Sequence, residues 1–175
     1  MYDATYKIIV FGDVGVGKTT LLNLTKTEQI FDSDSSMTIG VDFEKKDLIV
    51  DEKKVKLQIW HYGGGERFRF LLPTYVKGAS GGLFMYDITN YFSLAHIDDW
   101  LSMVKKETSS LIPIVAVGCK GDLTDKREIT AKEGINISKS RDIDAFIECS
   151  SKTGENVEEV FKTLTRLMLQ RDNII

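Results

Sequence analysis

The sequence predicts an α/β protein built on a six-stranded, mostly parallel sheet with helices on both faces. Short apolar runs alternate along the chain with segments of helical periodicity, which is typical of parallel strands joined by crossover helices. The 175 residues match the size of one domain, and no repeat, low-complexity stretch or Pro- or Gly-rich linker divides them. We therefore expect a single domain over residues 1–175.

Six runs are predicted as strands. Four are short and apolar, as expected of strands covered on both faces: residues 7–11, 55–60, 82–86 and 114–117. Residues 145–148 form a weaker fifth. Residues 43–50 are more polar and are joined to the next strand by residues 51–54, so we expect this pair to form an antiparallel hairpin at one edge of the sheet.

Two segments have the apolar spacing of amphipathic helices, and we interpret both stripes as faces buried in the core. Ser93 is predicted as the N-cap of the first. The first stripe consists of Leu94, Ile97, Trp100, Leu101 and Val104. The second consists of Val157, Val160, Phe161, Leu164 and Leu167.

Composition excludes several classes of function. The net charge of -3 and the pI of about 5.5 give no electrostatic reason to expect nucleic-acid binding. The two cysteines, Cys119 and Cys149, form no CxxC pair and fit a reduced, cytoplasmic setting. The sequence has no signal peptide and no apolar run of membrane-spanning length, so we expect no membrane insertion by this segment.

Residues 12–19 (GDVGVGKT) satisfy the GxxxxGK[ST] phosphate-binding pattern between a predicted strand and a helix. Gly15 and Gly17 allow a tight loop whose backbone N–H groups point at phosphates. Lys18 would reach the outer phosphates, and the Thr19 hydroxyl would ligate Mg²⁺. The alternative is a glycine-rich turn before an ordinary helix, and motif and context together favour the phosphate site. The predicted contacts are Asp13, Val14, Gly15, Val16, Gly17, Lys18, Thr19 and Thr20.

Residues 118–122 (GCKGD) follow a predicted strand and resemble the NKxD guanine box of Ras-like GTPases. The carboxylate of Asp122 can accept hydrogen bonds from N1–H and N2–H₂ of guanine, a pair of donors that adenine lacks. The alternative is a loop carboxylate that starts a turn. Residues 149–152 (CSSK) resemble the further box that backs the base. The resemblance implies contacts with GTP or GDP from Cys119, Lys120, Asp122, Ser150, Ser151 and Lys152.

The resemblance extends over residues 6–169 and is strongest to the Rab type. Residues 38–43 (TIGVDF) look like Rab switch I, and the segments 57–60, 66–69, 75–79 and 86–89 continue the match in order. It implies a P-loop small G-domain that acts as a switch in vesicle traffic, with an exchange factor, an activating protein and effectors as partners. Thr38 would join Thr19 as a Mg²⁺ ligand.

Phe43, Trp60 and Tyr75 fall where Rab proteins carry an aromatic triad that contacts effectors, and Ile39 is expected to face effectors too. The alternative is that the three aromatic side chains are simply core. The resemblance also implies a cytoplasmic protein. We expect this segment to lack the membrane-anchoring tail, so peripheral association with vesicles would need an anchor on a longer native chain.

Four departures from the family pattern bear on the chemistry. Where Rab proteins read WDTAGQE, residues 60–66 read WHYGGGE. His61 replaces an aspartate that supports Mg²⁺ through water, which should weaken metal binding. The alternative is that the His61 side chain points away from the site and has no effect. Gly65 replaces the glutamine that orients the attacking water. Val14 adds bulk to the phosphate loop, and Cys119 replaces the asparagine of the guanine box.

The sequence thus predicts a GTPase with weak intrinsic hydrolysis, weakened Mg²⁺ binding and Lys18 as its remaining catalytic residue, with Gly64 also near the nucleotide. The alternative is a pseudo-GTPase scaffold that binds nucleotide without significant turnover. A P-loop enzyme of another kind, such as a nucleotide kinase, is disfavoured by the guanine box and by the lack of an Arg-rich lid segment.

Overall fold

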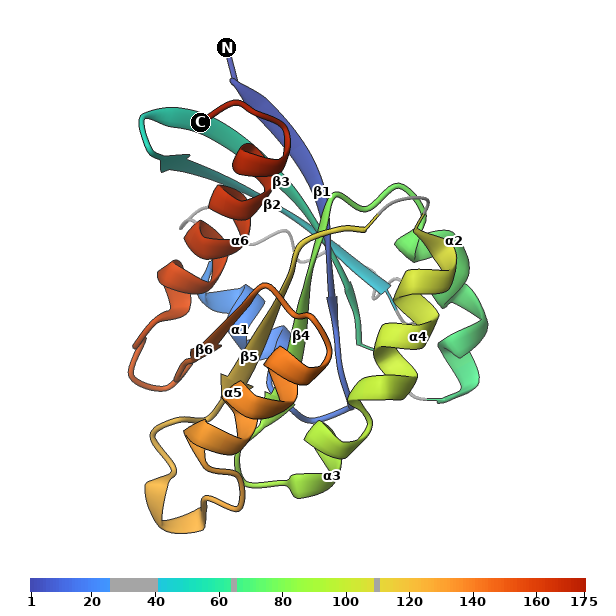
Figure 1. Ribbon diagram of the computed structural model, residues 1–175, viewed down its shortest axis with the longest axis vertical. Helices are drawn as coiled ribbons and strands as arrows, with labels where there is room; N and C mark the ends of the chain where they lie inside the picture. Colours follow the sequence, from blue (N-terminus) through green and yellow to red (C-terminus); the bar gives the residue numbers. More distant parts are fainter. Residues whose placement is uncertain (26–40, 64–65, 109–110) are drawn as a thin grey trace, which may run out of the picture.

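The computed structural model describes residues 1–25, 41–63, 66–108 and 111–175. A six-stranded sheet in the order β2-β3-β1-β4-β5-β6 forms the centre of the molecule (Figure 1). Helices α1 and α6 cover one face, and α2, α3, α4 and α5 cover the other. The predicted α/β class with helices on both faces is confirmed.

The six predicted strands are confirmed, and most of them extend further than the apolar runs. Only β2 and β3 pair antiparallel; the other neighbouring strands are parallel. Asp51 and Glu52, both with positive φ, make the two-residue turn of the predicted hairpin. The strands are β1 (Ala4–Phe11), β2 (Val41–Val50), β3 (Lys53–Tyr62), β4 (Gly81–Asp87), β5 (Ile114–Cys119) and β6 (Ala145–Glu148).

The helices of the described chain are α1 (Lys18–Leu24), α2 (Leu72–Val76), α3 (Tyr91–Ala95), α4 (Ile97–Glu107), α5 (Ala131–Ser140) and α6 (Val157–Arg171), with 3₁₀ turns at Glu66–Leu71 and Thr124–Lys126. Within this part of the chain, no helix is long and apolar enough to cross a membrane. Both predicted apolar stripes lie in the core, and Leu167 is the one member of intermediate exposure, since the other members are buried.

The predicted cap at Ser93 is wrong. Asn90 caps α3 instead, since its side chain accepts a hydrogen bond from the N–H of Phe92 at 3.1 Å. Ser93 is buried within α3, where its Oγ accepts from the N–H of Asp87 at 2.9 Å and donates to the carbonyl of Asn90 at 2.7 Å. Both residue types are good caps, and the need to pair the N–H of Asp87 inside the protein decides between them.

Alternation along the strands divides the core into two layers. In β1, Ile8 and Val10 pack against α1 and α6, whereas Ile9 and Phe11 pack on the opposite face. Because β1, β4, β5 and β6 run parallel, the loops that follow them meet at one end of the sheet. The predicted phosphate and guanine segments therefore come together there.

Candidate nucleotide-binding site

The loop between β1 and α1 passes close beside β4. A Cβ at Gly12 would lie only 2.1 Å from the carbonyl oxygen of Met85, so only glycine allows this approach. Gly17, which precedes α1, has a φ of 111°, a conformation that side chains disfavour. The two glycines thus shape the loop that the sequence predicts to bind phosphate.

Lys18 lies buried over this loop. Its Nζ donates hydrogen bonds to the carbonyl of Gly12 at 2.7 Å and to that of Asp13 at 2.6 Å. Burial lowers the pKa of Lys18 to about 8, although the nearby Asp13 carboxylate opposes the shift. The loop carbonyls fix the amine at the phosphate end of the site.

A cavity of about 170 Å³ opens where the loop meets the end of β3. Val14 stands at this cavity with 67% of its surface exposed. Val16, by contrast, is buried in the core, so only its backbone can serve the site. The lining consists of Val14, Gly15, Gly17, Lys18, Thr19, Thr20 and Gly63.

His61 points into the site, and the alternative in which its side chain points away is wrong. Its Nε2 lies 3.3 Å from the Thr19 hydroxyl and 3.8 Å from Oδ2 of Asp42, and the residue is 2% exposed. The Thr19 hydroxyl is an oxygen ligand of the kind that Mg²⁺ accepts, whereas an imidazole offers the ion no anionic oxygen. Thr19 therefore fits the metal, and position 61 does not.

The carboxylate of Asp13 is turned away from the cavity toward α4. It accepts hydrogen bonds from Nε1 of Trp100 at 2.8 Å and lies 2.6 Å from Nδ1 of His96. Only the backbone of Asp13 is thus placed to make the predicted contact with nucleotide. Sequence reasoning did not assign His96 or Trp100 to the site, because Trp100 fits the apolar stripe of its helix and the contact spans most of a hundred residues.

The predicted guanine box lies at the ends of β5 and β6. Ser150 donates a hydrogen bond to Oδ1 of Asp122 at 2.7 Å, which orients this carboxylate. Lys120 reaches the phosphate loop, where its Nζ donates to the carbonyl of Gly15 at 3.1 Å. Ser151 is half-buried and Lys152 is exposed in the turn after β6. The structure therefore brings the two predicted boxes together and links them to the phosphate loop.

Asp87, at the end of β4, is a supporting residue that the sequence did not single out. Its Oδ2 lies 2.6 Å from Nζ of Lys120, and its Oδ1 accepts from the N–H and hydroxyl of Thr89. Burial opposes ionisation of Asp87, but the hydrogen bonds from Lys120 and Thr89 outweigh it and hold its pKa below the ordinary value. Asp87 thus positions Lys120, and the only signal for it was its place in the matched segment 86–89.

Phe43, Trp60 and Tyr75 form one cluster of contacting rings, and they differ in how far they are exposed to solvent. The ring centroids of Phe43 and Trp60 lie 4.8 Å apart, and those of Trp60 and Tyr75 lie 5.9 Å apart. Phe43 is 41% exposed and Tyr75 is 5% exposed. Neither reading of the sequence holds for all three residues, because Tyr75 is core while Phe43 faces solvent.

Three residues predicted to contact nucleotide, metal or effectors, Thr38, Ile39 and Gly64, lie outside the residues that the structure describes, and so does Gly65, which replaces the water-orienting glutamine. Their roles stay predictions.

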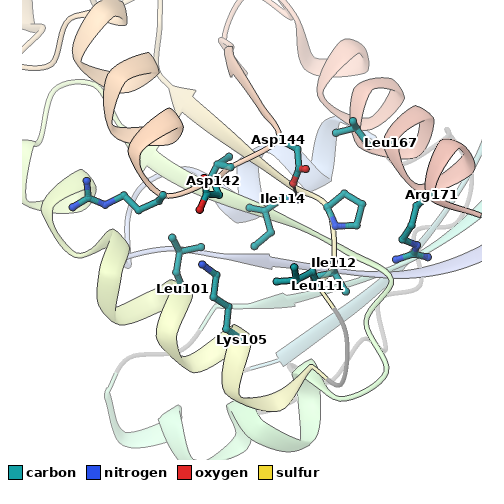
Figure 2. A pocket seen from close by; sticks show the side chains of 12 residues that line it. Leu101, Lys105, Leu111, Ile112, Ile114, Asp142, Asp144, Leu167 and Arg171 are labelled. Atoms are coloured by element: carbon teal, nitrogen blue, oxygen red, sulfur yellow. Dashed lines mark hydrogen bonds between the residues drawn. The ribbon is translucent and has the colours of Figure 1, made fainter.

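Figure 2 shows a second cavity, of about 380 Å³, at the opposite end of the sheet. It lies where β5 and β6 begin, whereas the phosphate loop follows the end of the parallel strand β1. Its walls mix apolar side chains such as Leu101 and Leu167 with the charged Lys105, Asp144 and Arg171. None of the predicted nucleotide contacts that the structure describes lines this cavity.

Comparison with known proteins agrees with the geometry of the site. The model of the Ras family matches residues 7–170. Rab-8B of Homo sapiens is 39% identical over 172 residues, which cover 98% of this chain and 82% of that protein. Rab-4 of Dictyostelium discoideum is 42% identical over 165 residues, or 94% of this chain and 80% of that protein. The chain therefore belongs to the Ras family and is a Rab-like small GTPase.

Proposed function

We propose that this chain is a guanine-nucleotide switch in vesicle traffic whose intrinsic GTP hydrolysis is slow. The observation that carries the proposal is the contrast within one site. The base-binding side keeps an oriented carboxylate at Asp122, whereas the phosphate side places a buried imidazole beside Thr19. This contrast supports a protein that still binds guanine nucleotide but hydrolyses GTP slowly.

Guanine recognition rests on Asp122 and the two loops around it, residues 119–122 and 149–152, which we call the base-binding loops. The hydrogen bond from Ser150 leaves the carboxylate with lone pairs that can accept from N1–H and N2–H₂ of guanine. Lys120 ties the first loop to the phosphate loop through Gly15. The base and the phosphates would then be held by one connected set of hydrogen bonds.

Slow hydrolysis follows from what surrounds the phosphate cavity. Val14 stands at the cavity with a branched, exposed side chain where the attacking water and the terminal phosphate need room. Gly65 supplies no side chain to orient that water.

Thr19, with Thr38, would hold Mg²⁺, which when bound neutralises phosphate charge. Because position 61 has lost the carboxylate that binds metal-bound water, the affinity for Mg²⁺ should fall about 10–100-fold.

Effectors would bind at the aromatic cluster of Phe43, Trp60 and Tyr75, and Ile39 is predicted to be a further effector contact. Exposed aromatic side chains are frequent anchors of protein interfaces, and Phe43 is the open end of this cluster. Lys45 lies over the ring of Phe43 and Lys7 over that of Trp60. An exchange factor and an activating protein complete the partners that a Rab-like switch uses.

Nucleotide content and single-turnover hydrolysis test the proposal. We expect the purified chain to carry guanine nucleotide and to hydrolyse GTP no faster than Ras, at roughly 3–5 × 10⁻⁴ s⁻¹. Val14→Ser should raise the rate, and Ile49→Ser, at an exposed apolar site on β2, serves as the matched control. An unassisted rate above about 10⁻² s⁻¹ would exclude slow hydrolysis. Tight guanine binding with no turnover would instead identify the pseudo-GTPase scaffold that the same departures allow.

A further inference from the structure

Cys119 and Cys149 lie side by side beneath the base-binding loops. Strands β5 and β6 pair in parallel register up to Gly118 and Glu148, so the two cysteines are the next residues on each strand. The pairing continues at this point, since the N–H of Cys149 donates to the carbonyl of Gly118 at 2.8 Å. Both side chains belong to the core layer under α1 and α6, so both thiols project from the same face of the sheet.

The two thiols are neighbours with different surroundings. The Cys119 Sγ donates to the carbonyl of Val117 at 3.7 Å. The neighbouring thiol, together with burial, raises the pKa of Cys119, whereas the presence of Cys119 lowers the pKa of Cys149. Both residues are buried, with 4% and 2% of their surfaces exposed. Cys149 is therefore the better nucleophile of the pair, with Cys119 placed to react next.

We propose that Cys119 and Cys149 are a site of reversible oxidation, where an intramolecular disulfide joins the two base-binding loops. Disulfides connect Cα atoms about 4.4–6.8 Å apart, and neighbouring strands lie about 4.7–4.9 Å apart. The bond can therefore form without separating β5 from β6. Its formation does not depend on the proposed function, whereas its effect on nucleotide exchange does.

Hydrogen peroxide is the oxidant that the chemistry requires. When the loops open, the Cys149 thiolate attacks one peroxide oxygen, so that an S–O bond forms, the O–O bond breaks and hydroxide leaves as water. The Cys119 sulfur then attacks the Cys149 sulfur, forming the S–S bond and releasing the second oxygen as water. Two thiols lose two electrons and two protons, and one peroxide becomes two waters.

The bond would hold the base-binding loops in their closed arrangement. The carbonyl of Cys149 accepts from the N–H of Gly121 at 3.0 Å, and the next residue, Ser150, holds Asp122. A covalent link between positions 119 and 149 therefore restrains the elements that must part for a base to leave. We expect nucleotide release to slow several-fold in the oxidised protein and to recover on reduction.

Peptide mapping of the full chain after peroxide treatment tests bond formation. Oxidised monomer should lose about 2 Da, the mass of two hydrogens, and yield a cross-linked peptide joining positions 119 and 149 that disappears on reduction. Cys119→Ser and Cys149→Ser, each lacking one partner, should yield none. Thiols that stay reduced, sulfinic acid without cross-link, or dimers joined between chains would overturn the proposal. If either variant fails to fold, the peptide map of the wild-type protein is enough to show whether the bond forms.

Release of fluorescent GDP from reduced and oxidised protein tests the consequence. Slower release after oxidation, reversed by a thiol reductant and absent in Cys149→Ser, supports a redox-responsive site. Unchanged release from a protein shown to be cross-linked overturns the regulatory role. Failure of both forms to bind GDP would refute the proposed function, while the mapped cross-link would stand on its own.

Discussion

His61 lies buried at the end of β3, with its Nε2 3.3 Å from the Thr19 hydroxyl. A carboxylate in this place would accept hydrogen bonds from metal-bound water and add a negative charge near the ion. A neutral imidazole adds no negative charge, and it has a single acceptor nitrogen in place of two carboxylate oxygens. The geometry of this one residue therefore bears directly on how far nucleotide binding depends on Mg²⁺.

Replacing His61 with aspartate should increase the dependence of nucleotide binding on Mg²⁺. We expect a chelator to speed GDP release only slightly in the wild-type protein and much more in His61→Asp, because the added carboxylate strengthens metal binding about 10–100-fold. His61→Asn adds an oxygen without charge and is the matched control. Acceleration by several orders of magnitude in the wild-type protein would show that the metal is held well despite His61.

Asp122 should determine the choice of base. A satisfied pair of hydrogen bonds to guanine is expected to favour GDP over ADP by at least about tenfold, or roughly 1.4 kcal/mol. Asp122→Ala should remove most of this preference, and Asp125→Ala, at an exposed carboxylate nearby, should keep it. Titration calorimetry with GDP and ADP measures both affinities, and equal values for the wild-type protein would refute the assignment.

At the scale of elements, the phosphate loop is braced by α4. Asp13 accepts from Trp100 and contacts His96, which joins the loop to a helix on the opposite face from α1. The indole ring of Trp100 also packs against the rings of Phe11 and Tyr62. Loop position and helix packing are thus coupled through one carboxylate.

Asp13→Ala should therefore weaken both stability and nucleotide affinity. It leaves the partly buried indole N–H of Trp100 without its acceptor, at a cost of about 1–3 kcal/mol. Asp98→Ala is the control, since Asp98 accepts from Arg141 in an exposed pair, where such contacts contribute little. Urea unfolding gives the stabilities. A smaller loss for Asp13→Ala than for Asp98→Ala would contradict the bracing role.

The end of α6 is fastened to β1 by Tyr6, whose hydroxyl donates to Asp172 at 3.0 Å. Burial, followed by this hydrogen bond, raises the pKa of Tyr6 to about 12. The unfolded chain releases the proton near the ordinary value of 10.0, so this contribution to stability is complete below pH 10 and is lost as pH rises toward 12.

Tyr6→Phe should accordingly cost about 1 kcal/mol at neutral pH and make stability less sensitive to pH above 10. Urea unfolding at a series of pH values from neutral to alkaline measures both effects. Tyr2→Phe, at the less buried phenol that bonds Asp47, is the control. The same alkaline slope in Tyr6→Phe and in the wild-type protein would contradict the assignment.

The sequence predicted the elements that carry strong local patterns and missed those that do not. Four strands follow from apolar runs and two from weaker patterns, whereas α5 buries only Gly134 and Ser138 and has no apolar stripe. A Cβ at Gly134 would lie 2.3 Å from the Tyr86 hydroxyl, so close packing replaces hydrophobic patterning there. Thr130 and Glu133 form a capping box that the sequence does contain.

The same limit applies to the site. The phosphate loop is contiguous, so its pattern could be read directly. The contacts of Asp13 with Trp100 and of Asp87 with Lys120 join residues far apart in the chain, and no local pattern encodes them. The neighbouring thiols of Cys119 and Cys149 likewise follow only from strand register.

For the whole molecule, stability depends on two apolar layers packed on opposite faces of one sheet. Phe161 is fully buried in the layer under α6. Phe161→Ala should cost about 3–5 kcal/mol, a large part of the roughly 5–15 kcal/mol that stabilises a typical domain. Gln170→Ala, on the exposed face of the same helix, is the control. A loss below about 1 kcal/mol by thermal or urea unfolding would contradict the assigned packing.

The strand order has a consequence for how copies of the chain meet. It places β2, a strand of ten residues, at one edge of the sheet. An edge strand of this length offers unpaired backbone groups to which a second copy can add. β2 has five charged residues between positions 42 and 47, namely Asp42, Glu44, Lys45, Lys46 and Asp47, and such charges discourage this addition. Charge along this edge strand should therefore discourage self-association of the sheet.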